Sequence, residues 1–308
     1  SHLIKNLLDN NYSVLGVDNF SDFYSEKIKK FNLSPLLKYK KFKFTRLDLS
    51  KPGLEKKLNS ADLVIHLAAQ PGVRGSWGDS FNVYVKDNII GLQKILEWSA
   101  NSKITKFIFA SSSSIYGDTE TLPMNELKSV PMPVSPYGST KLTGENLCRI
   151  YHKNFGLDYY CLRFFSVYGP AQRPDMAFMK LFKAALTGTE FQMFGDGNQT
   201  RDFTYINDII SGIIKTVELN KSQFRTFNLG GGSRISMNDV LKIVKEITGK
   251  KIIIKKTGKK KGDVKDTLSS NALSGKVLGY KPEVKLTEGL CSQFEWIKKN
   301  LKLINEMP

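Results

Sequence analysis

Short apolar runs alternate with longer amphipathic stretches along the first half of the chain. This alternation predicts βαβ units and a parallel sheet. Runs such as LVIHLAA and KFIFA lack the polar and apolar alternation of a half-exposed strand, which indicates strands covered by helices on both faces. The expected strands are residues 13–17, 42–46, 63–67, 106–110 and 159–165, with helices between them.

After about residue 170 the pattern loosens into loops rich in Pro, Gly and Asp, and helical patterns return at 236–248 and 286–300. We therefore expect an α/β fold. A doubly wound parallel sheet of the dinucleotide-binding type should occupy residues 1–168, and later segments should return to it. Residues 169–308 should form mainly a smaller C-terminal lobe that binds the substrate.

The chain opens on SHLIKNLLDNNYSVLGVDN, a helix followed by a strand that ends in an acid. A dinucleotide fold places another strand and a Gly-rich turn before such a helix, so we expect this first strand to be missing. Asp18 stands where an acid accepts hydrogen bonds from the adenosine ribose, although an Asp that simply ends a strand fits equally well. The glycine cluster at 230–232 lacks GxGxxG spacing and does not supply the missing turn.

Composition describes an ordinary globular protein of 308 residues, 41% hydrophobic and 24% charged. No run of about 18 apolar residues and no secretory signal pattern occur, so we expect a cytoplasmic location and no membrane partner. Cys148, Cys161 and Cys291 lack CxxC spacing and predict buried thiols rather than disulfides or a metal site.

The net charge of +17 favours an anionic partner without choosing one. Many of the lysines lie in the stretches 38–43 and 255–261, where few aromatic residues are interleaved. Because stacking platforms for bases are scarce there, we expect a solvated basic surface and no nucleic-acid partner.

The segment SPYGSTK places Tyr137 and Lys141 four residues apart, side by side on a helix. Ser135 is the expected cap and Pro136 the expected first helical residue. The positive helix end and the Lys141 ammonium should both lower the pKa of Tyr137 from about 10, which would make it a base. A YxxxK pair standing alone is most often an ordinary helix face.

A serine run, SSSSIYG, comes after the strand KFIFA at a carboxyl end, where open α/β sheets bind ligands. A serine run alone is typical of a strand that passes into a loop. Here the Ser112 hydroxyl can hydrogen-bond the substrate oxygen whose proton Tyr137 removes. Ser112, Tyr137 and Lys141 together therefore predict a catalytic trio.

Several segments resemble the NAD-dependent epimerase/dehydratase family of extended short-chain dehydrogenases, and the resemblance covers essentially the whole chain. They are VIHLAAQPGVR, KDNIIGLQKILE, FIFASSSSIYGD, SPYGSTKLTGE, LRFFSVYGP, RPDMA, GDGNQTRDFTYINDI and GDVKDT. The resemblance implies NAD as cofactor, a UDP-sugar substrate and a homodimer built on the helices at 88–100 and 137–151. The chain departs from the family in lacking the first strand and GxxGxxG.

Carried over residue by residue, the resemblance implies two sets of contacts. Those with the dinucleotide are Asp18 and Asn19 at the adenosine ribose, Asp48 and Leu49 beside the adenine, then Ala68, Ala69 and Asn88, with Tyr137 and Lys141 at the nicotinamide end. Those with the nucleotide sugar are Arg74, Ser112, Ser113, Ser166, Arg173, Arg201 and Asp263. Arg201 corresponds to an arginine on the diphosphate. Pairing with Asp202 is the alternative role for Arg201.

The implied reaction begins when Tyr137 takes the proton of the sugar 4-hydroxyl while hydride passes from C4 to NAD. Return of the hydride after the ring has turned inverts C4. Family members that dehydrate or decarboxylate commonly carry acids after the catalytic hydroxyl, where this chain has Ser113 and Ser114. Simple epimerisation is therefore the better interpretation.

The stretch SVYGPAQRPDMA bears on the identity of the sugar. Many UDP-glucose 4-epimerases have Asn in place of Ser166, whereas UDP-glucuronate 4-epimerases have a small hydroxyl residue followed by RPDMA. Arg173, and secondarily Arg74, are candidates to bind the sugar carboxylate. An ion pair with Asp175 is the alternative for Arg173.

These residues predict conversion of UDP-glucuronate to UDP-galacturonate, for polysaccharide biosynthesis. The alternative enzymes are a UDP-glucose or UDP-N-acetylhexosamine 4-epimerase and a nucleotide-sugar dehydratase or decarboxylase. A non-catalytic nucleotide-binding protein and a basic RNA-binding protein are the alternatives from other classes. The joint presence of Ser112, Tyr137 and Lys141 argues against lost catalysis.

Overall fold

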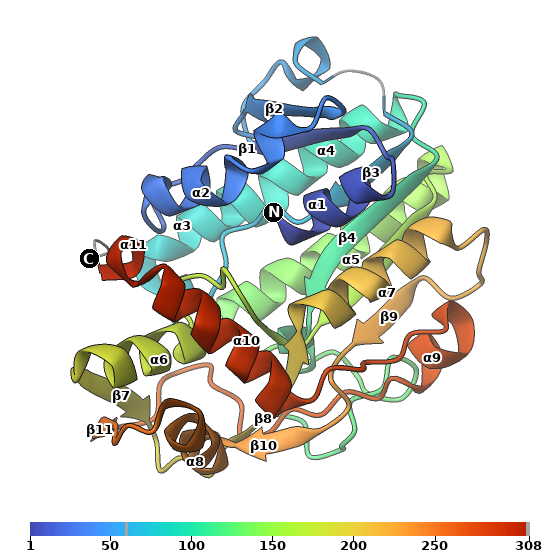
Figure 1. Ribbon diagram of the computed structural model, residues 1–308. Coiled ribbons are helices and arrows are strands. Elements are labelled where there is room, and N and C mark those ends of the chain that lie inside the picture. The colour runs from blue at the N-terminus through green and yellow to red at the C-terminus, as the bar shows by residue number, and fades with distance from the viewer. Residues whose placement is uncertain (59–60, 306–308) are drawn as a thin grey trace.

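The computed structural model describes residues 1–58 and 61–305 and shows an α/β fold (Figure 1). Residues 59–60 and 306–308 of the two expected domains lie outside the described residues. The strands are β1 (Val14–Asp18), β2 (Phe42–Arg46), β3 (Leu63–His66), β4 (Lys106–Ser112), β5 (Tyr159–Phe164), β6 (Ser166–Tyr168), β7 (Glu190–Phe194), β8 (Thr200–Tyr205), β9 (Thr226–Leu229), β10 (Arg234–Ser236) and β11 (Ile253–Thr257). The helices are α1 (His2–Asp9), α2 (Glu26–Leu33), α3 (Phe81–Tyr84), α4 (Gly91–Ala100), α5 (Pro136–Phe155), α6 (Ala177–Thr187), α7 (Ile206–Glu218), α8 (Met237–Thr248), α9 (Ala272–Leu278), α10 (Leu286–Lys299) and α11 (Leu301–Asn305).

The main sheet is parallel, with the strand order β3-β4-β5-β9, and β1 and β2 form a separate parallel pair. Every residue of β4 is buried, which explains why its sequence lacks alternation. The side chains of Phe107 and Phe109 pack toward α4 and α5, whereas Ile108 packs in a cluster with α1 and α7. Helices therefore cover both faces, as the sequence predicts.

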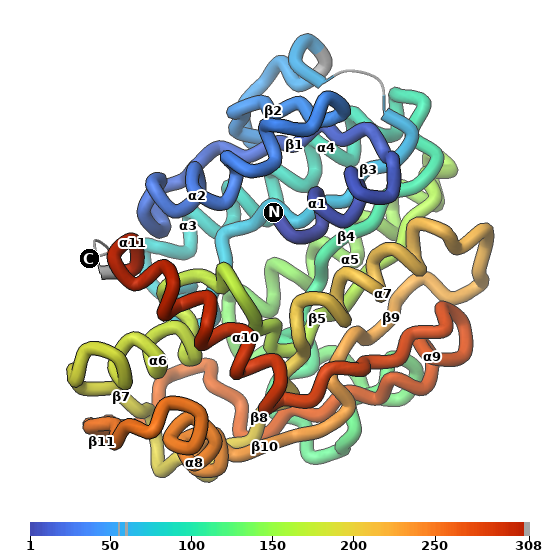
Figure 2. The backbone as a smooth tube through the Cα atoms, viewed as in Figure 1, coloured from blue at the N-terminus to red at the C-terminus, as the bar shows by residue number. Residues whose placement is uncertain are grey.

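Residues after 168 are divided between the two parts of the molecule. Strand β9 joins the main sheet and α7 packs on that sheet, whereas β10-β8-β6 and β7-β11 form separate small sheets. A second core, around Phe178, Phe182, Val244 and Leu290, joins α6, α8 and α10. Figure 2 shows α10 passing from this smaller lobe toward the N-terminal part of the chain.

The expected helix start at SPYG is confirmed. Pro136 is the first residue of α5, and the Ser135 hydroxyl accepts a hydrogen bond from the Gly138 amide at 3.1 Å. The expected helices at 236–248 and 286–300 are present as α8 and α10. Cys148 and Cys161 are buried as expected, but Cys291 is exposed because α10 turns it away from the core, which corrects the expectation of a buried thiol.

Among residues 1–58 and 61–305, no helix has both the length and the apolar character that crossing a bilayer requires.

Lys106 supports the fold from the start of β4. Its buried Nζ donates hydrogen bonds to the carbonyls of Thr216, Val217 and Leu219, at 3.0, 2.6 and 2.6 Å, where α7 ends. We expect Lys106→Met to lower the free energy of unfolding by about 2 kcal/mol, because these carbonyls lose their charged donor. Urea denaturation measures the change. The exposed Lys103→Met is the control, and equal stabilities of the two variants would contradict the prediction.

Candidate active site

The three predicted catalytic side chains meet at the carboxyl end of β4. Ser112, the last residue of β4, acts on the Tyr137 phenol at the start of α5 closely enough to lower its pKa. The buried Lys141 Nζ donates to the Ala110 carbonyl at 2.8 Å and lies 6.0 Å from the centre of the Tyr137 ring. A strand end and a helix start thus bring a hydroxyl, a phenol and an ammonium group to one place.

The packing of neighbouring residues fixes this arrangement. Gly138 lets the first turn of α5 approach the serine run at 111–114. A Cβ at residue 138 would lie 2.6 Å from the Ser114 carbonyl oxygen. The Tyr84 ring meets the Tyr137 ring edge-on, with centroids 6.3 Å apart. The Tyr84 hydroxyl donates to the carbonyls of Pro71 and Gly72 at 2.9 and 2.8 Å. Sequence reasoning missed Tyr84, because no spacing rule indicates a contact between separate elements.

The pKa of Tyr137 corrects one prediction. Burial raises this pKa above 10, against the opposing effects of the hydrogen bond with Ser112 and the charge of Arg173. Burial also lowers the pKa of Lys141, to about 8. The expected lowering of the Tyr137 pKa is therefore wrong for this structure, because removal from water outweighs the nearby positive charge.

The residues assigned to the adenosine end lie at or just after the carboxyl ends of β1 and β2. Asp18 ends β1, and its Oδ1 accepts the Phe20 amide at 2.7 Å. The Asn19 Oδ1 accepts the Ser21 amide at 2.9 Å. Asp48 accepts the Ser50 amide and forms a 2.9 Å ion pair with Lys86.

Burial alone would raise the pKa of Asp48, but hydrogen bonds from Ser50 and Lys86 lower it to about 2. The neighbouring Leu49 is partly buried and packs on the α4 and α5 side of the sheet. The two acids therefore lie at the carboxyl ends of neighbouring parallel strands, at the edge where a dinucleotide fold binds adenosine.

The loop after β3 offers an open apolar surface. Leu67 is 47% exposed and Ala68 is also exposed, directly after the buried His66, and Ala69 is partly buried. Asn88 is buried and holds this loop, accepting the Gln70 amide at 2.7 Å and donating to the Gln70 carbonyl at 3.1 Å. Together with Asp18, this exposed apolar cradle fits a dinucleotide.

The glycine cluster at 230–232 binds a carboxylate of the chain itself. The amides of Gly231 and Gly232 donate to the two carboxylate oxygens of Asp202, at 2.7 and 3.2 Å. The Ser269 amide also donates to Asp202, at 2.9 Å. Because a carboxylate of the chain itself takes these donors, the cluster does not replace the Gly-rich turn, as its spacing predicts.

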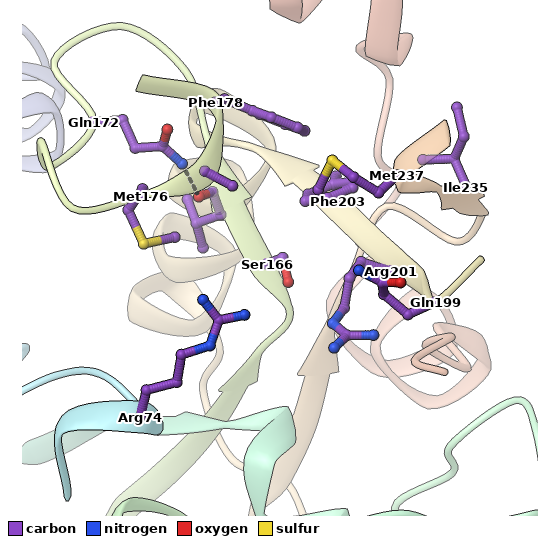
Figure 3. Close-up of a pocket in the computed structure, with 12 residues that line it drawn as sticks. Arg74, Ser166, Gln172, Met176, Phe178, Gln199, Arg201, Phe203, Ile235 and Met237 are labelled. Carbon is purple, nitrogen blue, oxygen red and sulfur yellow. Dashed lines mark hydrogen bonds between the residues drawn. The ribbon is translucent and has the colours of Figure 1, made fainter. Parts of the chain in front are cut away.

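A cavity lined mostly by residues after 165 carries the predicted substrate residues Arg74, Ser166 and Arg201 (Figure 3). Arg74 and Arg201 approach it from opposite sides. Its other lining residues, which the sequence did not indicate, are Val167, Gln172, Met176, Ala177, Phe178, Gln199, Phe203, Ile235 and Met237. They come from several short elements after residue 165, so only their packing brings them together.

Arg201 is held by main-chain oxygens. Its Nη1 donates to the carbonyls of Thr200 and Lys265 at 2.9 and 3.0 Å, and its Nη2 donates to that of Val264 at 2.8 Å. The alternative pairing with Asp202 is wrong, because the Asp202 carboxylate binds amides of the glycine loop instead. Uncharged oxygens thus fix the Arg201 guanidinium at the cavity.

Arg74, Asp263 and Arg173 were also predicted to bind the substrate, and each forms an ion pair within the chain. The guanidinium of Arg74 forms a bidentate pair with Asp263, with Nη2 2.8 Å from Oδ2, and lies 4.0 Å from the centre of the Phe194 ring. Arg173 pairs with Asp175 at 3.1 Å, as the alternative for this residue predicted. Ser113 is partly buried and begins the short 3-10 helix Ser113–Tyr116.

Within the described part of the chain, no group of three or more His, Cys, Asp or Glu side chains could hold a metal ion.

The family model for the NAD dependent epimerase/dehydratase family matches residues 1–230. The chain belongs to the NAD-dependent epimerase/dehydratase family. It is 41% identical over 300 residues to an uncharacterised UDP-glucose epimerase of Bacillus subtilis (strain 168), covering 96% of this chain and 94% of that protein.

Two further family members bear on the substrate. A UDP-glucuronate 4-epimerase of Thermodesulfobacterium geofontis (strain OPF15) is 39% identical over 305 residues, covering 98% of this chain and 93% of that protein. The crystal structure of the UDP-glucuronic acid 4-epimerase of Bacillus cereus, in complex with UDP-glucuronic acid and NAD, is 40% identical with a TM-score of 0.92. That match covers 97% of this chain and 95% of the other.

Proposed function

We propose that this protein epimerises UDP-glucuronate to UDP-galacturonate at C4, with NAD as its cofactor. The observation that carries the proposal is the meeting of Ser112, Tyr137 and Lys141 at the carboxyl end of β4, together with a cavity that Arg74 and Arg201 enter from opposite sides. The UDP-glucuronate 4-epimerases of T. geofontis and B. cereus support this choice of substrate.

In this proposal Tyr137 takes the proton of the sugar 4-hydroxyl, and Ser112 holds the oxygen that loses it. Lys141, one helical turn on, places a positive charge beside the phenol and binds the nicotinamide ribose. Bound NAD supplies the hydride acceptor and donor for C4. The dinucleotide would be held by Asp18, Asp48 and the apolar loop after β3.

The two residues after Ser112 support simple epimerisation. Ser113 and Ser114 occupy the positions where dehydratases and decarboxylases of the family commonly carry acids. The Ser114 amide and hydroxyl both lie 3.1 Å from the Ser112 Oγ. Ser114 therefore holds the catalytic hydroxyl, and neither serine offers a carboxylate to carry a proton for elimination.

The charge state of Lys141 predicts a pH dependence. Because burial lowers the pKa of Lys141 to about 8, we expect kcat of the NAD-loaded enzyme to fall as the pH rises through this value. A lysine is charged below its pKa, so the loss comes on the alkaline side. A profile from about pH 6 to pH 10 spans this transition and the ordinary lysine range. In Lys141→Arg the guanidinium stays charged, so this alkaline limb should disappear; its persistence would contradict the assignment.

Arg173 is the proposed contact of the sugar carboxylate. We expect Arg173→Gln to lower kcat/KM for UDP-glucuronate about 30-fold, the effect of losing one charge-assisted hydrogen bond. The value of kcat/KM for the neutral UDP-glucose should change little. Asp175→Asn breaks the same ion pair but keeps the arginine, so it serves as the matched control. Equal losses for both sugars, or in both variants, would mean that Arg173 is structural.

A UDP-glucose 4-epimerase is the second candidate, favoured by the name of the B. subtilis family member. Comparing kcat/KM for UDP-glucuronate, UDP-glucose and UDP-N-acetylglucosamine tests the choice. We expect UDP-glucuronate to be preferred. Turnover of neutral sugars alone would reject the proposed substrate while leaving the trio in place.

The proposal includes a cytoplasmic homodimer that serves polysaccharide biosynthesis. Exposed apolar side chains on or beside α4 and α5, among them Ile90, Ile150 and Phe155, support a contact between copies through these helices. Sedimentation velocity measures the assembly. A monomer at all concentrations would reject this part of the proposal.

A further inference from the structure

The buried carboxylate of Glu145 connects α5 to the main sheet. Glu145 lies on α5 one turn after Lys141 and is only 9% exposed. Its Oε1 accepts hydrogen bonds from the Ser111 hydroxyl at 2.5 Å and from the Arg163 Nε at 2.9 Å. Its Oε2 accepts from the Arg163 Nη2 at 2.7 Å. Glu145 thus joins α5 to both β4 and β5.

Three side chains of α5 face three consecutive residues at the end of β4. Tyr137, Lys141 and Glu145 are spaced by four residues and lie on one side of the helix. Lys141 donates a hydrogen bond to the Ala110 carbonyl and Glu145 accepts one from the Ser111 hydroxyl, while the next β4 residue, Ser112, lowers the pKa of Tyr137. A shift of the helix would therefore change all three contacts together.

Close packing leaves the helix little freedom beside Glu145. At Gly144 a Cβ would lie 2.4 Å from the Phe109 ring of β4, so the helix runs directly against the strand. The ion pair of Glu145 and Arg163 is bidentate, and the two side chains are 10% and 6% exposed. Such a planar pair fixes direction as well as distance.

The hydrogen bonds of Arg163 extend to Tyr116, which lies two residues after the serine run at 111–114. The Arg163 Nη1 donates to the Tyr116 hydroxyl at 2.8 Å, and that hydroxyl donates to the Asn228 Oδ1 at 2.8 Å. The Asn228 main-chain amide donates to the Glu126 Oε1 at 2.7 Å. Arg163 is thus engaged on all three of its nitrogens, and losing Glu145 would leave its charge buried and unpaired.

We propose that Glu145 is a positioning residue for the reaction: through Ser111 and Arg163 it sets Tyr137 and Lys141 at their working distance from Ser112. This inference rests on the proposed function, and it adds a residue that touches neither substrate nor cofactor. A purely stabilising ion pair is the competing explanation.

The first variant is Glu145→Gln in the NAD-loaded enzyme, which keeps the shape and removes the charge. We expect kcat for UDP-glucuronate to fall about 10- to 100-fold, because a small displacement of the reacting groups has effects of this size. KM and the affinity for UDP should stay unchanged, since the Arg201 side of the cavity is untouched.

Three further variants separate positioning from stability. Ser111→Ala removes the link to β4 and leaves the ion pair, so kcat should fall while the unfolding midpoint stays. Asp158→Asn breaks the ion pair with Arg225 at the opposite end of β5, so the midpoint should fall while kcat stays. The double variant Glu145→Met with Arg163→Met should regain stability, since apolar side chains can replace a buried pair, but should not regain kcat.

A readout independent of the sugar completes the test. In protein labelled with ¹³Cζ-tyrosine, the Tyr137 resonance is assigned by its loss in Tyr137→Phe. Its pKa should rise in Glu145→Gln and Ser111→Ala, because Ser112, which lowers this pKa, would act on the phenol less closely. Wild-type kcat in Ser111→Ala, or regained kcat in the double variant, would overturn the inference. Lack of turnover by the wild type would reject the proposed function, and the resonance would still decide the positioning.

Discussion

Replacing Tyr137 with phenylalanine is expected to lower kcat about 1,000-fold, the usual contribution of a positioned proton-transfer group. Phenylalanine keeps the ring that meets Tyr84 edge-on and removes only the hydroxyl, on which Ser112 acts. The fold and the binding of UDP-glucuronate should therefore persist. Turnover followed by NMR, with calorimetry for binding, measures both quantities.

Tyr39→Phe is the control for Tyr137→Phe. The Tyr39 hydroxyl donates to Asp9 at 2.8 Å on the surface, so this variant also loses one tyrosine hydroxyl with one partner. It should keep wild-type kcat. Full activity in Tyr137→Phe would show that another group takes the proton.

The second large effect is expected on binding. Arg201→Met should raise KM about 100-fold and change kcat less, because a fixed guanidinium at an anion site contributes a few kcal/mol. Main-chain carbonyls at 2.8–3.0 Å hold Arg201, so its orientation is present before the substrate arrives. The dissociation constant of UDP alone should rise by the same factor, since the proposed contact is the diphosphate.

A neighbouring arginine supplies the control for Arg201→Met. Arg234 lies on β10, paired in register with Asp202 of β8, and its side chain is 45% exposed. Arg234→Met should leave the affinity for UDP unchanged. Equal affinity of Arg201→Met and wild type for UDP would contradict the diphosphate assignment.

The strands β1 to β5 were predictable to within about two residues. For β4 and β5 the reason is burial on both faces, which gives continuous apolar runs. The start of α5 was predictable for a local reason, since Ser135 and Pro136 specify a helix start by themselves. A strand end and a helix start at known positions place Ser112 and Tyr137 at the same edge of the sheet. The meeting of Ser112, Tyr137 and Lys141 was therefore predictable as well.

The sheets of the smaller lobe were not predictable in the same way. Strand β8 pairs with β6 in parallel and with β10 antiparallel, and β11 pairs with the distant β7. These strands are short and lie among loops, so their pairing depends on tertiary packing rather than on periodicity. The roles of Glu145 and Tyr84, and the raised pKa of Tyr137, depend likewise on burial and on contacts between separate elements.

The most direct test is an NMR time course of the NAD-loaded enzyme with UDP-glucuronate carrying ¹³C at every sugar carbon. We predict conversion to UDP-galacturonate with the carboxyl carbon retained and with inversion at C4 alone. Release of labelled carbon dioxide with formation of a UDP-pentose, or no conversion of the uronate, would contradict the proposed reaction.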